Sequence, residues 1–156
     1  MKKIRFIFKY ALGVYVVVLI FALFLYDRHV SSFPLLEYIQ RFSNVVPFAT
    51  FRKYIYFLMH GRIEVQYVLR QIAQNMLLFL PLGTLMPLCF DKFKSFKTTL
   101  IYIPCFFIIE FCQLVFKVGS FDIDDIILYF CGVVLGYVVY KLISKYILRC
   151  QIKPTV

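Results

Sequence analysis

Four long apolar stretches constrain the fold of this 156-residue chain more than any other feature of its sequence. An α-helix needs about 20 apolar residues to cross the hydrocarbon core of a bilayer. Charge-free stretches of that order run over residues 10–26, 71–90, 98–116 (apart from Glu110) and 126–140, the last continuing amphipathically to about residue 148. We therefore predict an all-α, polytopic integral membrane protein with four transmembrane helices, in a single membrane domain that covers residues 1–156.

The composition supports a membrane protein and argues against the soluble classes that a basic chain suggests. Hydrophobic residues make up 62% of the chain and the mean hydropathy is +0.82, which is too apolar for a soluble domain of this length. The net charge of +10 would suggest nucleic-acid binding in a soluble protein. Here, however, the Lys and Arg residues flank the apolar stretches, as topology signals do. We therefore expect the lipid bilayer as a partner and no nucleic acid.

The distribution of basic residues predicts the orientation of the four spans. Under the positive-inside rule, Lys and Arg are enriched in the cytoplasmic segments that flank the spans. Residues 1–9, 91–97 and 141–156 carry 11 Lys and Arg residues over 32 positions, whereas residues 27–70 and 117–125 carry 7 over 53. The sequence therefore predicts a multi-pass protein of the cell membrane, with both termini in the cytoplasm and the loop of residues 27–70 outside.

The predicted outer loop differs in composition from a solvated linker. Phe, Tyr, Leu and Ile occur throughout residues 27–70, with a helix-like run at 35–42 and a segment that mixes aromatic and basic residues at 51–59. Such a mixture is typical of segments at a membrane interface. We predict that this loop is partly helical, with short helices that lie on the membrane surface.

One carboxylate lies inside an apolar span. Glu110 is about thirteen residues beyond Lys97, which at 1.5 Å per residue places it in the outer half of the third span. An ionisable group at such a depth costs at least about 2.5 kcal/mol, so it normally faces a wet or protein-lined cavity. Gln113 lies on the same helix face because three residues separate the two. The pair can form a polar site or, alternatively, hydrogen bonds that join neighbouring helices.

Three further carboxylates, those of Asp122, Asp124 and Asp125, occur within four residues just before the fourth span. In a turn or a first helical turn these side chains can converge on one site. Capping of a helix N-terminus explains one or two of them equally well. Oxygen ligands suit Ca²⁺ or Mg²⁺, but an EF-hand is excluded because Ile127 and Val133 stand where its loop needs Gly and Glu. We predict no metal site and no cofactor.

The second and fourth spans contain two further features. Asn75 lies near the predicted outer start of the second span and is another polar candidate. Gly132 and Gly136 form a GxxxG pattern in the fourth span, which predicts the close approach of a neighbouring helix. The sequence contains no GxSxG, Walker or CxxC motif. Catalytic residues therefore stay unknown, and any catalysis would need the carboxylates or a basic residue of the outer loop.

Four pieces of the chain carry a family resemblance. They are residues 44–48 (Asn-Val-Val-Pro-Phe), residues 75–79 with Pro81, Leu82 and Gly83, residues 110–113 (Glu-Phe-Cys-Gln), and residues 120–125 followed by Gly132 and Gly136. In order and spacing they resemble the VanZ-like family of small bacterial membrane proteins, whose namesake is associated with resistance to the glycopeptide antibiotic teicoplanin. Tyr129 departs from the family pattern, which usually has Asn there. Either its hydroxyl replaces that amide in a polar site, or the chemistry of this chain differs.

The resemblance adds Asn44 to the candidate polar site. On the predicted topology, the candidates all lie in the outer half of the membrane or outside it, where they can surround one outward-facing cavity. The candidate site residues are Asn44, Asn75, Glu110, Gln113, Asp122, Asp124 and Asp125.

The resemblance implies a cell-envelope protein that acts at the outer leaflet and modulates glycopeptide susceptibility or handles an envelope precursor. Its expected partners are then a lipid-linked cell-wall precursor or the antibiotic, and basic residues of the outer loop can contact an anionic group or lipid headgroups. These basic residues are Arg41, Arg52, Lys53 and Arg62. Two alternatives stay open. A membrane-embedded hydrolase or transferase on a lipid-linked substrate would use Glu110 or Asp125 as general acid or base. A small transporter subunit would use Glu110 as a proton site.

Overall fold

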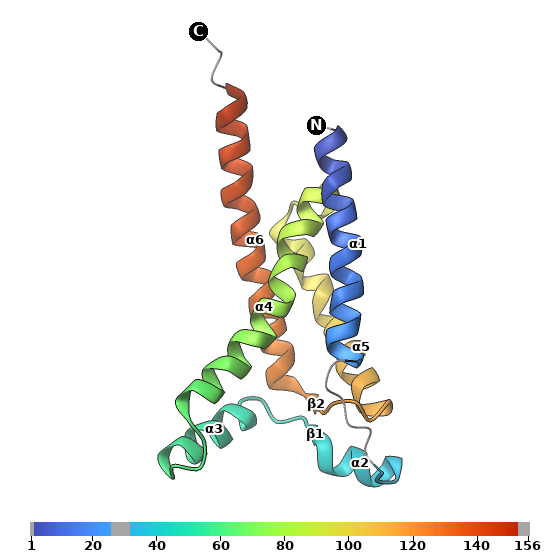
Figure 1. Cartoon of the computed structure of the whole chain (residues 1–156), viewed down its shortest axis with the longest axis vertical. Coiled ribbons are helices and arrows are strands. Elements are labelled where there is room, and N and C mark those ends of the chain that lie inside the picture. Colours follow the sequence, from blue (N-terminus) through green and yellow to red (C-terminus); the bar gives the residue numbers. More distant parts are fainter. Residues whose placement is uncertain (1, 26–31, 153–156) are drawn as a thin grey trace.

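The computed structural model describes residues 2–25 and 32–152 of the chain (Figure 1). Within these residues it contains six α-helices, two short 3₁₀-helices and one pair of two-residue strands. In chain order the elements are α1 (Lys2–Phe24), α2 (Leu35–Phe42), β1 (Ser43–Asn44), α3 (Ala49–Met59), α4 (Val65–Cys89), η1 (Asp91–Phe93), η2 (Phe96–Ile101), α5 (Tyr102–Val115), β2 (Phe121–Asp122) and α6 (Ile123–Ile152).

Four segments are long and apolar enough to cross a membrane, which confirms the predicted all-α polytopic fold. They are Arg5–Phe24, Val65–Cys89, Phe96–Val115 and Ile123–Tyr146. α1 shows the physical reason most clearly, because bulky apolar side chains such as Phe6, Val14 and Phe21 are more than half exposed along it. A helix that is apolar on its outer surface is stable in lipid, where its backbone groups are satisfied internally.

The helices extend beyond the charge-free stretches of the sequence. α1 begins at Lys2 rather than at residue 10, and α4 begins at Val65 rather than at residue 71. Long charged side chains reach the interface while the backbone stays helical, so a charge marks the edge of the hydrocarbon core and not the end of the helix. The third span is composite, because η2 precedes α5. Pro104 lies in the first turn of α5, where its missing N–H costs no hydrogen bond.

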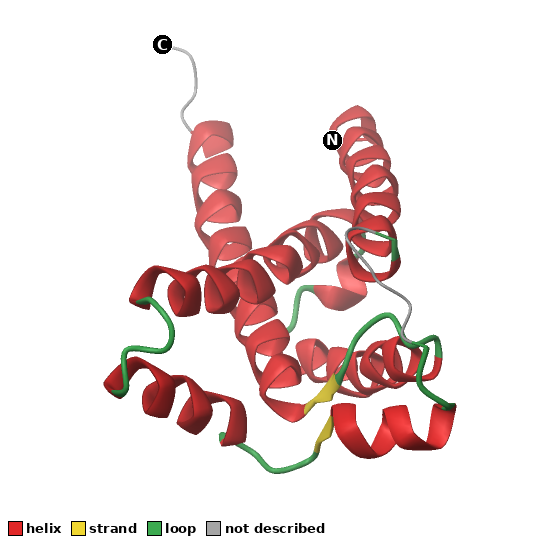
Figure 2. Ribbon diagram, turned by 60° about the horizontal axis from the view of Figure 1, so that its bottom comes forward, coloured by secondary structure: helices red, strands yellow, loops and turns green. Residues whose placement is uncertain are grey.

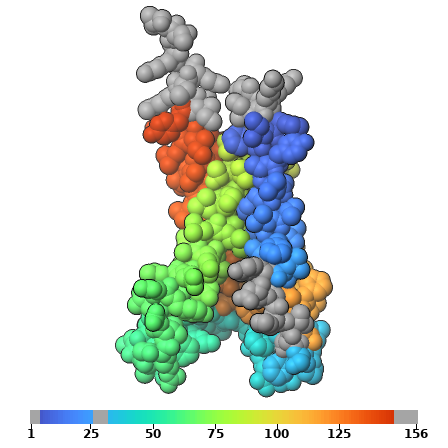
Figure 3. Space-filling view, viewed as in Figure 1, coloured from blue at the N-terminus to red at the C-terminus, as the bar shows by residue number. Residues whose placement is uncertain are grey.

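The two ends of the molecule differ in structure. The N-terminal end of α1 and the C-terminal end of α6 lie at one end, and α2, α3 and the strand pair lie at the opposite end (Figure 1). We call the latter the loop end. The space-filling view shows α2 and α3 there as two lobes separated by a hollow (Figure 3). The predicted outer loop and the turn before α6 therefore share one end of the bundle.

Close packing of α4 against α6 forms the main interface between the spans. A Cβ atom at Gly132 would overlap the Met76 carbonyl group, and one at Gly136 would overlap the Leu80 carbonyl group. Gly83 faces the backbone of α6 in the same way. The close approach predicted from the GxxxG pattern is thus confirmed, and the partner helix is α4.

The short helices predicted in the outer loop are present as α2 and α3, and the loop is tied to the turn between α5 and α6. β1 pairs with β2 in parallel, with Asn44 opposite Asp122, and Figure 2 shows this strand pair between α2 and α3. The Tyr38 hydroxyl of α2 donates to the Gly119 carbonyl oxygen at 3.0 Å. These contacts bring residues that are far apart in the sequence to one place at the loop end.

Candidate functional site

Asp122 lies at the centre of a hydrogen-bond network at the loop end. It directly precedes α6, and its Oδ1 accepts the backbone N–H of Asp124 at 2.8 Å, so it caps this helix. Asn44 Nδ2 donates to the same oxygen at 3.0 Å, and the Thr50 hydroxyl donates to Oδ2 at 2.5 Å. The outer loop therefore holds this carboxylate in a fixed position.

Asp124 fixes the start of α3. Its Oδ1 accepts the backbone N–H of Phe48 at 2.5 Å, and its Oδ2 accepts the backbone N–H of Thr50 at 2.8 Å. Phe48 has a φ of 64°, a left-handed conformation that strains a residue with a bulky side chain. Two charge-assisted hydrogen bonds to N–H groups at the helix start offset this strain. This bonding matches the capping alternative for one aspartate, although the helix that Asp124 caps is α3 and not α6.

Glu110 lies on α5 behind this network and is 1% exposed. Its Oε2 accepts the backbone N–H of Asp122 at 3.1 Å, and the Tyr129 side chain of α6 interacts with the carboxyl group. Its Oε1 makes no hydrogen bond within the described part of the chain. A buried oxygen without a donor is costly, because the group has lost its water. Oε1 of Glu110 can therefore still accept a hydrogen bond, whereas both carboxylate oxygens of Asp122 and of Asp124 already accept at least one.

Asn75 and Gln113 connect the site to α4 and α1. Asn75 Nδ2 donates to Asp125 Oδ1 at 2.5 Å across the α4–α6 interface. Gln113 Nε2 donates to the Leu23 carbonyl oxygen of α1 at 2.9 Å. The second bond joins two helices, which is the role expected for Gln113 under the alternative to a polar site.

A polar cavity of about 260 Å³ lies among these elements and contains two carboxylates, those of Asp122 and Asp125. None of the described residues that line it is Lys, Arg or His. Burial, and then the electrostatic effects of Tyr67 and of the two carboxylates, raises the pKa of Tyr54 above its ordinary 10.0. The cavity is therefore electrostatically negative. Its lining residues are Thr50, Tyr54, Gln71, Asn75, Gln113, Gly119, Ser120, Asp122, Asp125 and Tyr129.

Several lining residues were not among the sequence candidates. Thr50 and Tyr54 belong to α3, and no spacing in the sequence indicates that this short helix faces the carboxylates. Gln71 could have been predicted from the sequence, because it lies four residues before Asn75 and therefore on the same helix face. Tyr129, which departs from the family pattern, is buried, lines the cavity and interacts with the Glu110 carboxyl group.

A second cavity of about 400 Å³ adjoins the first. The two cavities share Thr50, Ser120 and Asp122, so they lie side by side. The second cavity also contains two cationic side chains, those of Arg41 and Lys53. The loop end thus has a negative cavity beside one with basic groups.

The basic residues of the outer loop are placed differently from one another. Arg41 pairs with Glu37, one turn before it on α2, with an N–O distance of 2.8 Å. Lys53 lies over the Phe57 ring and forms no ion pair with any residue that the structure describes. Arg62 lies over two aromatic rings of α3 and does not line either cavity. Arg41 and Lys53 are therefore the candidates for an anion contact.

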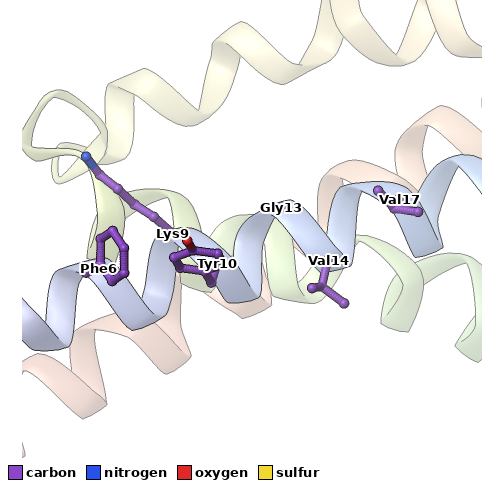
Figure 4. A pocket seen from close by; sticks show the side chains of 6 residues that line it. All are labelled: Phe6, Lys9, Tyr10, Gly13, Val14 and Val17. Carbon is purple, nitrogen blue, oxygen red and sulfur yellow. The ribbon is translucent and has the colours of Figure 1, made fainter.

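A further cavity of about 500 Å³ lies along α1 and is not part of this region (Figure 4). All of its lining residues belong to this one helix, and Lys9 is the charged residue among them. The groove runs along the lipid-facing surface of a candidate span, where acyl chains would fill it. Its lining residues are Phe6, Lys9, Tyr10, Gly13, Val14 and Val17. We therefore place the candidate functional site at the loop end.

Comparison with known protein families agrees with the sequence pattern. The VanZ/LLP1 family model matches residues 9–144, which contain all seven candidate polar residues and most of each candidate span. No curated protein and no solved structure matches the chain. The family match extends over far more than half of the sequence, and the structure has four helices of membrane-spanning length. The chain is a multi-pass membrane protein that belongs to the VanZ/LLP1 family.

Proposed function

We propose that this protein acts at the outer leaflet of the membrane, where its polar cavity binds the head of an envelope precursor and thereby modulates glycopeptide (teicoplanin) susceptibility. The observation that carries this proposal is the negative cavity of about 260 Å³ at the loop end, with basic groups beside it. A polar cavity at the end of a membrane bundle is within reach of an amphiphile whose head leaves the hydrocarbon core. Its amide, hydroxyl and carboxylate groups supply hydrogen bonds to such a head.

The bias of basic residues supports an outward-facing loop end. Residues 1–9, 91–97 and 141–156 have the higher density of Lys and Arg, which the positive-inside rule assigns to the cytoplasm. Arg5 of α1 and Lys94 both pair with Asp91, so the first two of these segments lie together at the end opposite to the cavity. With that end in the cytoplasm, the cavity faces the outer leaflet.

The test compares cells that express wild type, Glu110→Gln and Asp125→Asn at equal membrane levels. Teicoplanin susceptibility and surface binding of a labelled lipoglycopeptide are measured together. The matched control is Glu64→Gln, because Glu64 is exposed at the start of α4 and lines neither cavity. We expect wild type and the control variant to lower teicoplanin susceptibility and lipoglycopeptide binding relative to cells without the protein. The two site variants should lower neither. Site variants that act like wild type would refute the role of the cavity, and an inactive wild type would refute the glycopeptide role.

A second candidate function is hydrolysis or group transfer on a lipid-linked substrate. The observation that favours it is the Oε1 atom of Glu110, which has no hydrogen-bond partner in the described residues although the side chain is 1% exposed. A buried carboxyl group with a free oxygen can act as general acid or base. Turnover of a labelled lipid-linked precursor by the purified protein, lost in Glu110→Gln, would support catalysis. Binding without turnover would leave the first proposal as the better one.

A further inference from the structure

We propose that the two adjoining cavities bind a phosphate ester that carries an ammonium group, as the zwitterionic headgroup of a membrane lipid does. In this arrangement the ammonium group lies beside Asp125, and the phosphate group lies between Arg41 and Lys53. The inference rests on the proposed function, because it names the chemical class of ligand for the same cavity. Its physical basis is the difference in charge between two adjoining cavities. Asp125 lines the first alone, Arg41 and Lys53 line the second alone, and Asp122 lies between the two.

The negative cavity favours a cationic group. It contains the carboxylates of Asp122 and Asp125. Glu110 does not line the cavity, but it accepts the backbone N–H of Asp122 and has one oxygen that lacks a donor within the described residues. The donors that the structure supplies to Asp122 are amide, hydroxyl and backbone N–H groups, which satisfy lone pairs but leave the charge in place. Like charges at a buried site repel one another unless a cation or a proton offsets them. An ammonium group would supply both the charge and three donors.

Two tyrosines add to the preference for an ammonium group over a metal ion. Tyr54 and Tyr129 both line the negative cavity, and the face or the hydroxyl of such a ring is a partner for an organic cation. A metal ion held chiefly by protein side chains favours a cluster of anionic, thiolate or imidazole ligands. No group of three or more His, Cys, Asp or Glu side chains within the described residues is placed to hold one.

The neighbouring cavity suits the phosphate group. Arg41 and Lys53 line it from α2 and α3, and Thr50, Ser120 and Asp122 lie where the two cavities meet. The phosphate group would therefore lie on the side of this cavity that is formed by Arg41 and Lys53, away from Asp122. Arg41 has five N–H donors, so its pairing with Glu37 leaves donors for a phosphate oxygen. The two halves of the ligand would therefore be held by opposite charges, while hydroxyl groups contact the region between them.

The surroundings favour a lipid over a free metabolite. α3 exposes the apolar side chains of Ile55 and Met59, and Phe48 just before it is also exposed. Such a surface is stable at the interface between headgroups and acyl chains. A lipid could then place its headgroup in the cavities while its acyl chains remain in the bilayer.

The first experiment measures binding of soluble headgroup analogues to the full chain in detergent by calorimetry. Glycerophosphoethanolamine carries both charges, glycerol phosphate carries the anion alone, and ethanolamine carries the cation alone. We expect the first to bind at least about tenfold more tightly than either of the others, since one charge-assisted contact is worth about that factor. Asp125→Asn should abolish this preference and leave the weak binding of glycerol phosphate unchanged. Lys53→Gln should weaken both phosphate compounds, and Lys92→Gln, at the opposite end, should weaken neither.

The second experiment identifies the source of the headgroup. The protein is reconstituted in vesicles of phosphatidylglycerol alone or mixed with phosphatidylethanolamine, and the lipids that co-purify are counted by mass spectrometry. Retention of phosphatidylethanolamine by wild type and its loss in Asp125→Asn would support a lipid ligand. Binding of the soluble analogue without lipid retention would support the ligand chemistry and overturn the lipid source.

The outcomes separate this inference from the proposed function. If glycerophosphoethanolamine binds no more tightly than glycerol phosphate, or if Asp125→Asn keeps the preference, the zwitterionic ligand is wrong even where teicoplanin susceptibility still depends on Asp125. If the preference holds but susceptibility does not change with the protein, the ligand class stands and the glycopeptide role is wrong. Thermal unfolding of each variant is recorded in parallel, so that loss of binding is read only from folded protein.

Discussion

Replacement of Gly136 by alanine tests whether the close approach of α4 and α6 sets the stability of the bundle. The added Cβ would overlap the Leu80 carbonyl oxygen and lie 3.1 Å from the Cα of Gly83. Both are backbone atoms of α4, so no rotation of a side chain relieves the overlap and the helices must move apart. Overpacking costs about 1–3 kcal/mol, and contact with a rigid backbone places this site at the upper end of that range.

The gain in helix propensity offsets part of that cost. Alanine is favoured over glycine in a helix interior by about 1 kcal/mol, so we expect Gly136→Ala to lose about 2 kcal/mol of unfolding free energy. Gly13→Ala is the matched control, because a Cβ built there has no described atom within 4 Å apart from the nearby backbone of its own helix. The control should gain up to about 1 kcal/mol. The same methyl group is added in both variants, so the difference between them isolates the helix interface.

The assay follows the helical circular dichroism of each purified variant during titration with sodium dodecyl sulfate from one common detergent. The unfolding midpoints should rank Gly13→Ala at or above wild type and Gly136→Ala clearly below it. An unchanged midpoint for Gly136→Ala would refute the reasoning, since it would mean that the two helices do not touch where the structure has them in contact. Equal losses in the two variants would refute it as well, because the loss would then come from the methyl group in any span.

Two further predictions concern carboxylates near the ends of the spans. Asp124→Asn should remove one of the two hydrogen bonds to the start of α3 and lower the unfolding free energy by about 1.5–3 kcal/mol. Amide hydrogen exchange should then rise at residues 48–52 and stay unchanged inside α4. Equal exchange in the variant and the wild type would contradict the capping role. A hydrogen bond from Lys94, and to a lesser extent one from Arg5, lowers the pKa of Asp91 below its ordinary 3.8. The ionised carboxylate therefore stabilises the folded protein above about pH 4. This stabilisation is lost as the pH falls through the lowered pKa. Thermal unfolding of Asp91→Asn should therefore differ from wild type at pH 7 and converge with it on acidification, and a difference that persists at pH 2 would contradict this assignment.

The spans could be predicted because their length and composition are local properties. A stretch such as residues 10–26 is apolar enough to identify a membrane helix without knowledge of its neighbours. The GxxxG pattern of α6 predicted close packing for a similar reason, since glycine at that spacing has few other uses in a span. The identity of the partner helix was not predictable, because Met76 and Leu80 are ordinary apolar residues of α4.

The contribution of α3 to the site could not be predicted, because it depends on contacts between distant segments. Thr50 and Asp124 are 74 positions apart, and the hydrogen bond between them positions the helix that carries Lys53 and Tyr54. Basic and aromatic residues in a loop indicate the membrane interface equally well when no cavity is near. The strand pair between β1 and β2 and the two hydrogen bonds to Asp124 together hold α3 beside the carboxylates.

The three neighbouring aspartates show how a helix start separates residues that the sequence places together. Successive side chains of a helix point about 100° apart, whereas residues three positions apart share a face. Asp122 and Asp125 fit the second case, and both line the negative cavity. Asp124 fits the first case, and its carboxylate bonds to the start of α3. Asp122 ends β2 and also caps α6, so one residue takes part in the strand pair that holds the outer loop and in the start of the helix that carries Asp125. A substitution at Asp122 should therefore disturb fold and site together. Asp125 is the better position at which to test function, with thermal unfolding recorded in parallel because Asp125 also bonds to Asn75 of α4.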